Sequence, residues 1–478
     1  MKNGCLLRTL FLAGAICLGS SRFGFTQTAS PISLQDLSAF KNPGKSWQVA
    51  GDVEASLDKD NVLQPVKGTG ILVNLPNKKN YGSDLYTTAE YGDVDLELDY
   101  LMAKGSNSGV YLQGRYEIQL MDSWGRKSVT AADNGGIYER WDESKPGSQK
   151  GYEGYAPRQN ASRAPGLWQH LKVSFKAPTF DASGRKLTNA TILQLELNGV
   201  IVHEGVELMG PTRGAMANDE KATGPLRLQG DHGAVAFRNI TISNGIKVAA
   251  PVRERGNNAP DPIAVEAPVT TVLRSFMDMP GQGRVVHAVS VGSPEKVHYT
   301  YDMDRGNVIQ VWRGNFLDAT PMWHERGDGS SRPAGAVQRF GKSVFSLAKL
   351  ASSQTAWIAD TAGSGYRPKG YVLDDNDRPT FLYQVYGSKV SDAIRVMDNG
   401  QGFRREITVQ NPAPDLYARL AEGSSIEDKG KGMYLVDGKA YYLQLADASS
   451  SKPLIRGAND RKELIIPVKG KVVYSVIF

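Results

Sequence analysis

Residues 93–102 read DVDLELDYLM, and this strict alternation decides the fold class. Apolar residues occupy every second position, and the positions between them are acidic up to residue 99. Because successive side chains of a β-strand point to opposite faces of its sheet, the pattern predicts a half-buried strand of an antiparallel sheet. The side chains expected on the buried face are Val94, Leu96, Leu98, Tyr100 and Met102.

A hairpin is predicted over residues 190–204, because its Asn-Gly pair at 198–199 suits a two-residue turn that needs positive φ. Pairing outward from that turn places Leu197 opposite Val200 and Gln194 opposite His203.

The second half of the chain carries similar turn signals, and only residues 344–351 look weakly helical. Residues 302–307 separate two strand-like runs, and hairpins are expected over residues 371–386, with the turn at 374–377, and around 437–438 and 469–470. Many short strands joined by regular turns are typical of a β-sandwich or barrel, so we expect an all-β protein.

The first 29 residues have the pattern of a removable signal peptide. Lys2 and Arg8 accompany an apolar stretch at residues 10–18 that is too short to span a membrane. Cys17 raises the alternative of a lipoprotein cleavage site, but Ile16 stands where such sites need a small residue. No later stretch resembles a membrane span, so we expect a periplasmic or secreted protein.

Charge and cysteine content exclude several classes. Both cysteines, Cys5 and Cys17, lie in the leader, so we expect no disulfide and no thiolate metal site in the mature chain. The leader contains Lys2, Arg8 and Arg22 and no acidic residue, so its removal lowers the formal net charge from +6 to +3. Nucleic-acid binding needs a concentrated basic surface, so no nucleic-acid partner is expected.

A proline-rich seam divides the chain into two parts. Residues 246–268 contain prolines at positions 251, 260, 262 and 268, and this composition is typical of a linker. It separates a first predicted domain at residues 30–245 from a second at residues 269–478.

The densest polar stretch, residues 105–122, reads GSNSGVYLQGRYEIQLMD. If its last seven residues form a strand, Glu117 and Gln119 share a face, and Asp122 joins them only if a bulge intervenes. A carboxylate and an amide beside Arg115 suit the hydroxyls of a sugar. A solvated outer strand carries the same residue types, so this stretch alone leaves both interpretations open.

Eight short motifs occur in order across nearly the whole first half of the chain. They are NSGVY at 107–111, YEIQLMD at 116–122, DNGGIY at 133–138, LWQH at 167–170, LNGV at 197–200, GPLRLQ at 224–229, DHG at 231–233 and FRNI at 237–240. With these motifs, residues 47–242 resemble the 3-keto-disaccharide hydrolase domain family, a relative of concanavalin A-like lectins and glucanases. The resemblance implies a jelly-roll sandwich with a sugar-binding concave face, followed here by a second β-sandwich.

The related glucanases carry Glu-x-Asp-x-x-Glu on one concave strand, where this chain has Glu117, Gln119 and Asp122. The amide in the middle disfavours conventional hydrolysis, which needs paired carboxylates. A 3-keto sugar offers another route, because its carbonyl acidifies the proton on C2. A base removes that proton, the group at C1 leaves, and water adds.

This chemistry needs a base, a stabiliser for the enolate oxygen and an acid. We predict Glu117 or His232 as the base, Arg115 as the stabiliser, and Asp122 as the acid or as polar support. A divalent cation is the alternative stabiliser, with Asp122, Asp133 or His232 as its ligands. No other cofactor is expected.

The residues predicted to bind the substrate are Gln119, Tyr111, Asp133, Tyr138 and Trp124, although aromatic residues of a sandwich more often belong to its core. His170 and His203 occupy ordinary strand positions and are expected to be structural. No histidine spacing is typical of a zinc site.

The second half concentrates aromatic and charged residues at 312–318 and 322–329. Similar stretches occur in sandwich domains of exported sugar oxidoreductases and cytochrome-associated proteins, but no Cys-x-x-Cys-His motif is present here. We therefore expect an accessory sandwich that supports or positions the first domain, rather than a second catalytic site.

The leading hypothesis is an exported enzyme that cleaves the glycosidic bond of 3-keto-glycosides or related sugars by elimination and hydration. A separate sugar oxidoreductase would supply the substrate, because this chain has no Gly-rich dinucleotide-binding turn. The alternatives are a carbohydrate-binding protein without catalysis and a glucanase-like hydrolase that uses Glu117 and Asp122. The enzymatic hypothesis requires residues 116–122 to line the inside of a curved sheet, beside Arg115 and within reach of His232.

Overall fold

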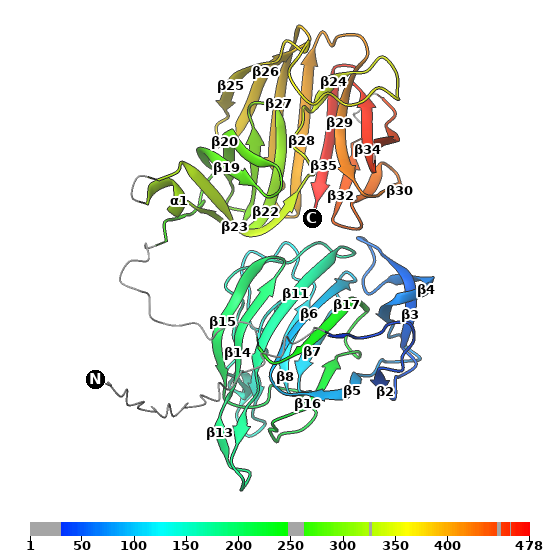
Figure 1. The fold of residues 1–478 in the computed structure, drawn as a ribbon, viewed down its shortest axis with the longest axis vertical. Helices are drawn as coiled ribbons and strands as arrows, with labels where there is room; N and C mark the ends of the chain where they lie inside the picture. The colour runs from blue at the N-terminus through cyan, green and yellow to red at the C-terminus, as the bar shows by residue number, and fades with distance from the viewer. Residues whose placement is uncertain (1–29, 247–261, 325–326, 447–450, 459) are drawn as a thin grey trace, which may run out of the picture.

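The computed structural model describes residues 30–246, 262–324, 327–446, 451–458 and 460–478. Within these ranges the only α-helix is α1 (Thr320–Trp323), and the remaining elements are β-strands and the 3-10 turn η1 (Gly147–Lys150). The predicted all-β fold class is confirmed (Figure 1). None of the described helical segments is long and apolar enough to cross a membrane. The predicted signal peptide and most of the predicted linker lie outside the described residues.

The first half consists mainly of two antiparallel sheets, drawn in the lower part of Figure 1. The larger sheet contains, in spatial order, β15 (Val200–Leu208), β14 (Ala190–Leu197), β11 (Trp168–Lys176), β6 (Val94–Met102), β17 (Val235–Asn244), β4 (Leu63–Asn74) and β3 (Trp47–Ala55), with β1 (Ser30–Pro31) paired to β17. The smaller sheet contains β2 (Phe40–Lys41), β5 (Leu85–Tyr91), β16 (Gly224–Leu228), β7 (Asn107–Leu112) and β8 (Tyr116–Met121). Two short hairpins join β9 (Arg140–Trp141) to β10 (Gly151–Tyr152) and β12 (Thr179–Phe180) to β13 (Lys186–Thr188).

One apolar core joins the two sheets. The alternating residues of β6 are buried in it as predicted, together with residues of β11 and β14 from the same sheet. From the five-stranded sheet, Val110 and Leu112 of β7 and Ile118 and Leu120 of β8 enter the same cluster. The sheets therefore pack face to face as the predicted jelly-roll sandwich, and the intervening residues of β7 and β8 lie on the face turned away from the core.

The second half, in the upper part of Figure 1, contains three more sheets. The six-stranded sheet contains β18 (Ala264–Val265), β22 (Asn307–Asp318), β21 (Val297–Asp302), β20 (Gly283–Gly292), β19 (Thr271–Met279) and β23 (Ser330–Arg339). The four-stranded sheet contains β24 (Leu347–Lys349), β29 (Leu416–Gly423), β34 (Arg461–Pro467) and β33 (Leu454–Ala458). The eight-stranded sheet contains β25 (Arg367–Leu373), β26 (Pro379–Val385), β27 (Ser388–Val396), β28 (Gly402–Gln410), β35 (Lys471–Ile477), β32 (Tyr441–Leu445), β31 (Met433–Val436) and β30 (Ile426–Gly430). One core cluster contains residues of all three sheets.

The two halves contact each other through specific side chains. Lys439 Nζ lies 2.7 Å from Asp52 Oδ1, and Leu167 belongs to the core cluster of the second half. Gly166 has a φ of +80°, and a Cβ there would clash with the Tyr442 hydroxyl. This glycine is therefore required both by its backbone conformation and by the close approach of the second half.

Three local predictions are wrong. Gln194 pairs with Glu204 rather than His203, because a bulge between Leu195 and Glu196 shifts the hairpin register. The turn at 469–470 joins β34 and β35, which belong to different sheets and do not form a hairpin. Residues 347–349 of the weakly helical stretch form β24, whose pairing with β29 overrides local propensity. In addition, β18 pairs with β22 although it lies inside the predicted linker.

Candidate functional site

Four polar or aromatic residues form one row across the outer face of the five-stranded sheet. Arg227 of β16 is the register partner of both Tyr86 of β5 and Tyr111 of β7. Tyr111 is in turn the partner of Glu117 of β8. The row Tyr86–Arg227–Tyr111–Glu117 therefore crosses four neighbouring strands on the face turned away from the core, and we call it the polar row.

Glu117 ends the polar row in an unusual environment. Its side chain is 2% exposed and lies over Gly109 of the adjacent strand, where any Cβ would clash with the carboxylate. Burial raises the pKa of Glu117 to about 8, although the Tyr111 hydroxyl and the Arg227 guanidinium favour the ionised form. Asp84 and Asp231 raise the pKa further. A carboxyl group that titrates near neutral pH is suited to proton transfer.

Arg227 supplies the positive charge of the polar row. Its guanidinium carbon lies 4.0 Å from the Tyr111 ring centroid, and Nη2 lies 2.5 Å from Asp84 Oδ2. The other Asp84 oxygen accepts a hydrogen bond from the backbone N–H of Gly230 at 3.1 Å, which ties this ion pair to the turn that carries Asp231. Arg227 Nε is buried and has no hydrogen-bond partner within the part of the chain that the structure describes. The polar row thus contains one buried donor without a partner among the described residues.

The polar row is covered on one side, which the sequence did not predict. The Thr212 hydroxyl accepts a hydrogen bond from Glu117 N–H at 3.0 Å, and Arg227 Nη1 donates to the Gly214 carbonyl at 2.5 Å. Segment 210–216 therefore lies over Glu117 and Arg227. On the other side, the turn that carries Asp231 and His232 is open to solvent. The Asp231 side chain is 48% exposed, and that of its hydrogen-bonded neighbour His232 is 52% exposed.

Gln119 and Tyr138 lie beside Glu117. Gln119 is on the same face of β8, is 3% exposed, and donates a hydrogen bond from Nε2 to Asn107 Oδ1 at 2.6 Å. Tyr138 is half-buried, and its backbone N–H donates to the Glu117 carbonyl at 3.1 Å. Both residues thus adjoin the polar row.

The Arg115 side chain faces away from the polar row. Its Nε donates to the Asp219 carbonyl at 2.6 Å, and its Nη2 lies 2.5 Å from Asp219 Oδ1. The side chain therefore ties the segment around Asp219 to the start of β8. The guanidinium that acts electrostatically on Glu117 belongs to Arg227 instead.

Asp122 follows the end of β8 and does not share the face of Glu117. The register of β7 with β8 is unbroken from Asn107–Met121 to Leu112–Tyr116, so the bulge that would have turned Asp122 inward is absent from this hairpin. Its carboxylate accepts backbone hydrogen bonds from Gly105 at 2.9 Å and Trp124 at 3.3 Å. Burial raises the pKa of Asp122, and these bonds counteract part of the rise. Asp122 therefore organises a turn.

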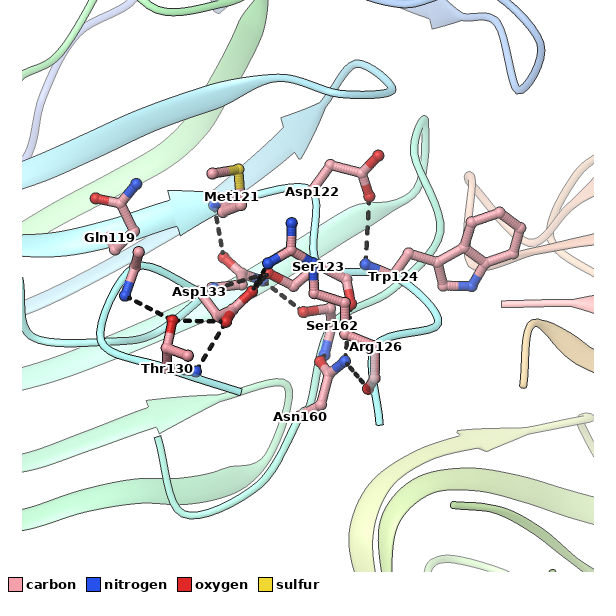
Figure 2. Close-up of polar contacts among 12 residues, drawn as sticks. Gln119, Met121, Asp122, Ser123, Trp124, Arg126, Thr130, Asp133, Asn160 and Ser162 are labelled. Atoms are coloured by element: carbon pink, nitrogen blue, oxygen red, sulfur yellow. Dashed lines mark hydrogen bonds and ion pairs between the residues drawn. The ribbon is translucent and has the colours of Figure 1, made fainter. Parts of the chain in front are cut away.

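Asp133 and Trp124 hold the loop that follows β8 (Figure 2). The Asp133 carboxylate is 1% exposed and accepts hydrogen bonds from Ser123, Arg126 and Thr130 at 2.7–3.0 Å. Trp124 points away from this network and donates from Nε1 to the Phe478 carbonyl of the second half at 2.8 Å. Both side chains are thus committed to structure, and neither faces the polar row.

No group of three or more His, Cys, Asp or Glu side chains arranged to hold a metal ion occurs within the described ranges. The three predicted cation ligands have separate roles: Asp122 bonds a turn, Asp133 bonds its own loop, and His232 pairs with Asp231. The predicted structural histidines lie elsewhere: His170 contacts Asp99 on the larger sheet, and His203 bonds the Gly135 carbonyl.

Arg227 and Asp84 were missed as site residues. The signal for Arg227 is present in GPLRLQ, where Leu226 and Leu228 enter the core and Arg227 between them must face outward. Its position next to Tyr111 follows only from the spatial strand order, in which β16 lies between β5 and β7 although it comes far later in the chain.

Comparison with known proteins finds a family model that matches within the first half of the chain. Residues 33–243 match the model of the 3-keto-alpha-glucoside-1,2-lyase-like domain. The predicted family resemblance is confirmed. The matched residues, which we call the lyase-like domain after this family model, include the polar row, and the match supports a carbohydrate-active, hydrolase-like enzyme. No curated protein matches the chain.

Solved structures similar to this chain include two named "putative glycosyl hydrolase", both from Parabacteroides distasonis. One is 24% identical over 45% of this chain and 83% of the other, with a TM-score of 0.33. The second is 19% identical over 45% of this chain and 99% of the other, with a TM-score of 0.29. The receptor-binding domain of botulinum neurotoxin type G is 8% identical over 90% of this chain and 92% of the other, with a TM-score of 0.24.

The raised pKa of Glu117 predicts a pH-dependent stability. Below about pH 4.5 the group is protonated in both folded and unfolded chains, and between 4.5 and about 8 only the folded chain keeps the proton. The free energy of unfolding is therefore expected to fall as pH rises through this window, by roughly 4–5 kcal/mol from this one group. Chemical denaturation of the wild type and Glu117→Gln over this range measures it. If the free energy of unfolding changed with pH in the same way for the two proteins, the raised pKa of Glu117 would be contradicted.

Proposed function

We propose that the lyase-like domain cleaves the glycosidic bond of 3-keto-glycosides, with Glu117 as the base that removes the proton on C2. The observation that carries this proposal is a buried carboxyl group of pKa about 8 in one row with an arginine and a tyrosine. The family match supports the substrate class.

The proposed reaction proceeds by elimination and hydration. The Glu117 carboxylate takes the C2 proton, and the electron pair moves onto the carbonyl oxygen at C3, where Arg227 and the Tyr111 hydroxyl stabilise the negative charge. Collapse of this enolate forms a C1–C2 double bond and expels the group at C1, which takes a proton as it leaves. Water then adds its hydroxyl to C1 and a proton to C2, so the net reaction is hydrolysis. His232, paired with Asp231 at the exposed end, is the proposed acid.

The keto group must be made elsewhere, so we propose that a separate sugar oxidoreductase supplies the substrate. We also propose that the chain is exported, on the basis of its leader. Amino-terminal sequencing of the protein purified from its host tests export: a mature end near residue 30 supports it, and an intact residue 1 contradicts it.

The function is tested by comparing a 3-keto-glycoside with its parent glycoside. We expect saturable release of the aglycone from the keto substrate alone. Release from the parent glycoside at a comparable rate would indicate conventional hydrolysis, which the structure supports less because Asp122 is bonded into a turn.

One observation favours the alternative of carbohydrate binding without catalysis. Segment 210–216 covers Glu117, whose side chain is 2% exposed, and this cover restricts the access of a sugar to the proposed base. A substrate must therefore enter from the side of Asp84 and Asp231. Binding of both sugars without turnover of either would establish that alternative.

The pH dependence of the reaction follows from the same carboxyl group. Because Glu117 acts as a base only when ionised, kcat/KM is expected to rise about tenfold per pH unit below its pKa and to level off above about 8. Initial rates at low substrate concentration over this range measure it. A rate that is flat or falls through the window would exclude Glu117 as the base.

Tyr81 lies at the proposed entrance and is 77% exposed. Its neighbour Gly82 packs so closely against Gly230 that a Cβ would clash with the Gly230 carbonyl, which places this segment beside the turn carrying Asp231. Stacking of a sugar on the ring predicts that Tyr81→Ala raises KM by about 2- to 10-fold and leaves kcat unchanged. Trp323→Ala, at a residue 51% exposed in α1, is the control and should change neither constant. An unchanged KM for Tyr81→Ala would remove this residue from the substrate site.

A further inference from the structure

Gly109 interrupts the row of side chains on the outer face of β7. Val110 and Leu112 of this strand enter the core. Alternation therefore turns Asn107, Gly109 and Tyr111 to the opposite face. A glycine inside a strand lowers stability relative to alanine, because it loses more backbone freedom on folding and adds no side chain to the packing. Alanine at position 109 would thus be expected to stabilise the strand.

The backbone of β7 does not require a glycine at this position. The φ of Gly109 is not positive, and the residue keeps the regular antiparallel register of the hairpin, opposite Gln119 of β8. An alanine adopts the extended conformation of a strand without strain. The requirement for glycine therefore lies in the space next to the strand and not in the conformation of the chain.

The space over Gly109, which we call the recess, is filled by the side chain of Glu117. A Cβ on Gly109 would overlap Glu117 Oε1 and would lie 3.1 Å from both Cγ and Cδ of the same side chain. These are the three atoms that such a Cβ would approach most closely. Because Oε1 is the far end of a flexible side chain, an alanine at position 109 would displace the carboxylate and not the strands.

The recess holds the Glu117 carboxylate close to the sheet. Gly109 lies beneath it, segment 210–216 lies over the residue, and the side chain is 2% exposed. This burial is the main cause that raises the pKa of Glu117 to about 8. A carboxylate that cannot enter the recess must lie farther from the sheet, and we expect it to move toward the open side at Asp231, where its ionised form is better solvated.

We infer that Gly109 is a positioning residue for the proposed base, because its lack of a side chain leaves the recess in which the Glu117 carboxylate lies. The role of that carboxylate rests on the proposed function, whereas the recess can be tested without turnover. The strand forgoes the stability that alanine would add and places a reacting group instead, as active sites commonly do.

The first test is Gly109→Ala in the full chain. At a pH above the Glu117 pKa of about 8, kcat for a 3-keto-glycoside is expected to fall about 10²-fold, because the base is moved out of line with the C2 proton. KM should stay within about twofold of the wild-type value, and Tm should equal or exceed it. Gly457→Ala is the matched control, because Gly457 of β33 also lacks a positive φ and a Cβ there meets nothing within 4 Å. This control should leave kcat and KM unchanged.

The second test observes the carboxyl group itself. The carboxyl carbon of Glu117 is labelled with carbon-13, and its resonance is assigned by its absence from Glu117→Gln. We expect this resonance to titrate near pH 8 in the wild type and in Gly457→Ala. In Gly109→Ala it should titrate at least about one pH unit lower, because the displaced carboxylate is less buried. An unchanged midpoint in Gly109→Ala, or a wild-type midpoint near 4.5, would overturn the inference.

The third test places Gly109→Ala in the Glu117→Gln variant. Because Gly109 is proposed to act only through the carboxylate, the second substitution should not lower the residual rate further. An equal loss of rate in both backgrounds, or a lower Tm for Gly109→Ala alone, would show that Gly109 serves the fold and would overturn the inference. If the wild type turns over no 3-keto-glycoside, the proposed function fails, and the titration of the Glu117 carboxyl still decides the role of Gly109.

Discussion

Glu117→Gln is expected to lower kcat/KM for a 3-keto-glycoside by about 10²- to 10⁴-fold, the range that general base catalysis contributes. The amide keeps the size and shape of the side chain over Gly109 but cannot take a proton. Since burial already favours the neutral form of Glu117, the substitution should not destabilise the fold at neutral pH. Steady-state kinetics and a thermal melt of the same preparation measure both effects.

Two further variants make that result specific. Glu97→Gln changes a carboxylate on the larger sheet, where Glu97 contacts His170 and Lys172, and should leave turnover unchanged. His232→Gln distinguishes the two bases considered from the sequence. If His232→Gln abolished turnover and Glu117→Gln retained it, His232 would be the base and Glu117 a structural residue.

The second large effect is expected on stability, at an ion pair inside the second half. Arg405 and Asp392 are 1% and 0% exposed, and the guanidinium donates to both carboxylate oxygens at 2.9 and 2.6 Å. Tyr301 donates to the same carboxylate at 2.9 Å. Arg405→Met leaves Asp392 buried and unpaired, so we expect the free energy of unfolding to fall by roughly 3–5 kcal/mol.

A double variant separates pairing from charge burial. Replacing Arg405 by Met and Asp392 by Leu together removes both charges and should restore much of the lost stability, because burying an ion pair is itself costly. Glu406→Gln is the matched control, since the neighbouring pair Glu406–Lys471 is 37% and 48% exposed and should contribute less than about 1 kcal/mol. Denaturant unfolding measures all three variants. A loss for Arg405→Met no larger than for Glu406→Gln would contradict this account.

Much of the architecture could be predicted from the sequence, because alternation directly reports which face of a strand is buried. Val94, Leu96 and Leu98 enter the core as expected. Turn chemistry located the hairpin at 198–199 but not its bulge, because Leu195 and Glu196 carry no local signal for an extra residue. The turn at 469–470 was misassigned for a related reason: a turn shows where the chain reverses, not which sheet the next strand joins.

The site was predicted less well, because its geometry depends on long-range packing. Parity placed Glu117 and Gln119 on one face correctly. Proximity in the sequence suggested that Arg115 acts beside them, and only the tertiary contact with Asp219 shows that its side chain is engaged elsewhere. The contact between Arg227 and Tyr111 depends on the spatial order of the strands. The polar row is covered by segment 210–216, which is a loop without regular secondary structure.

The central claim is that Glu117 removes the proton from C2 of a 3-keto sugar, and an isotope effect at that carbon tests it most directly. Turnover of a 3-keto-glycoside carrying deuterium at C2 is compared with turnover of the unlabelled substrate at a pH above 8. We predict a primary isotope effect on kcat/KM and, for the unlabelled substrate in heavy water, one deuterium at C2 of the sugar formed. Equal rates for the two substrates, with no deuterium incorporated at C2, would contradict the claim.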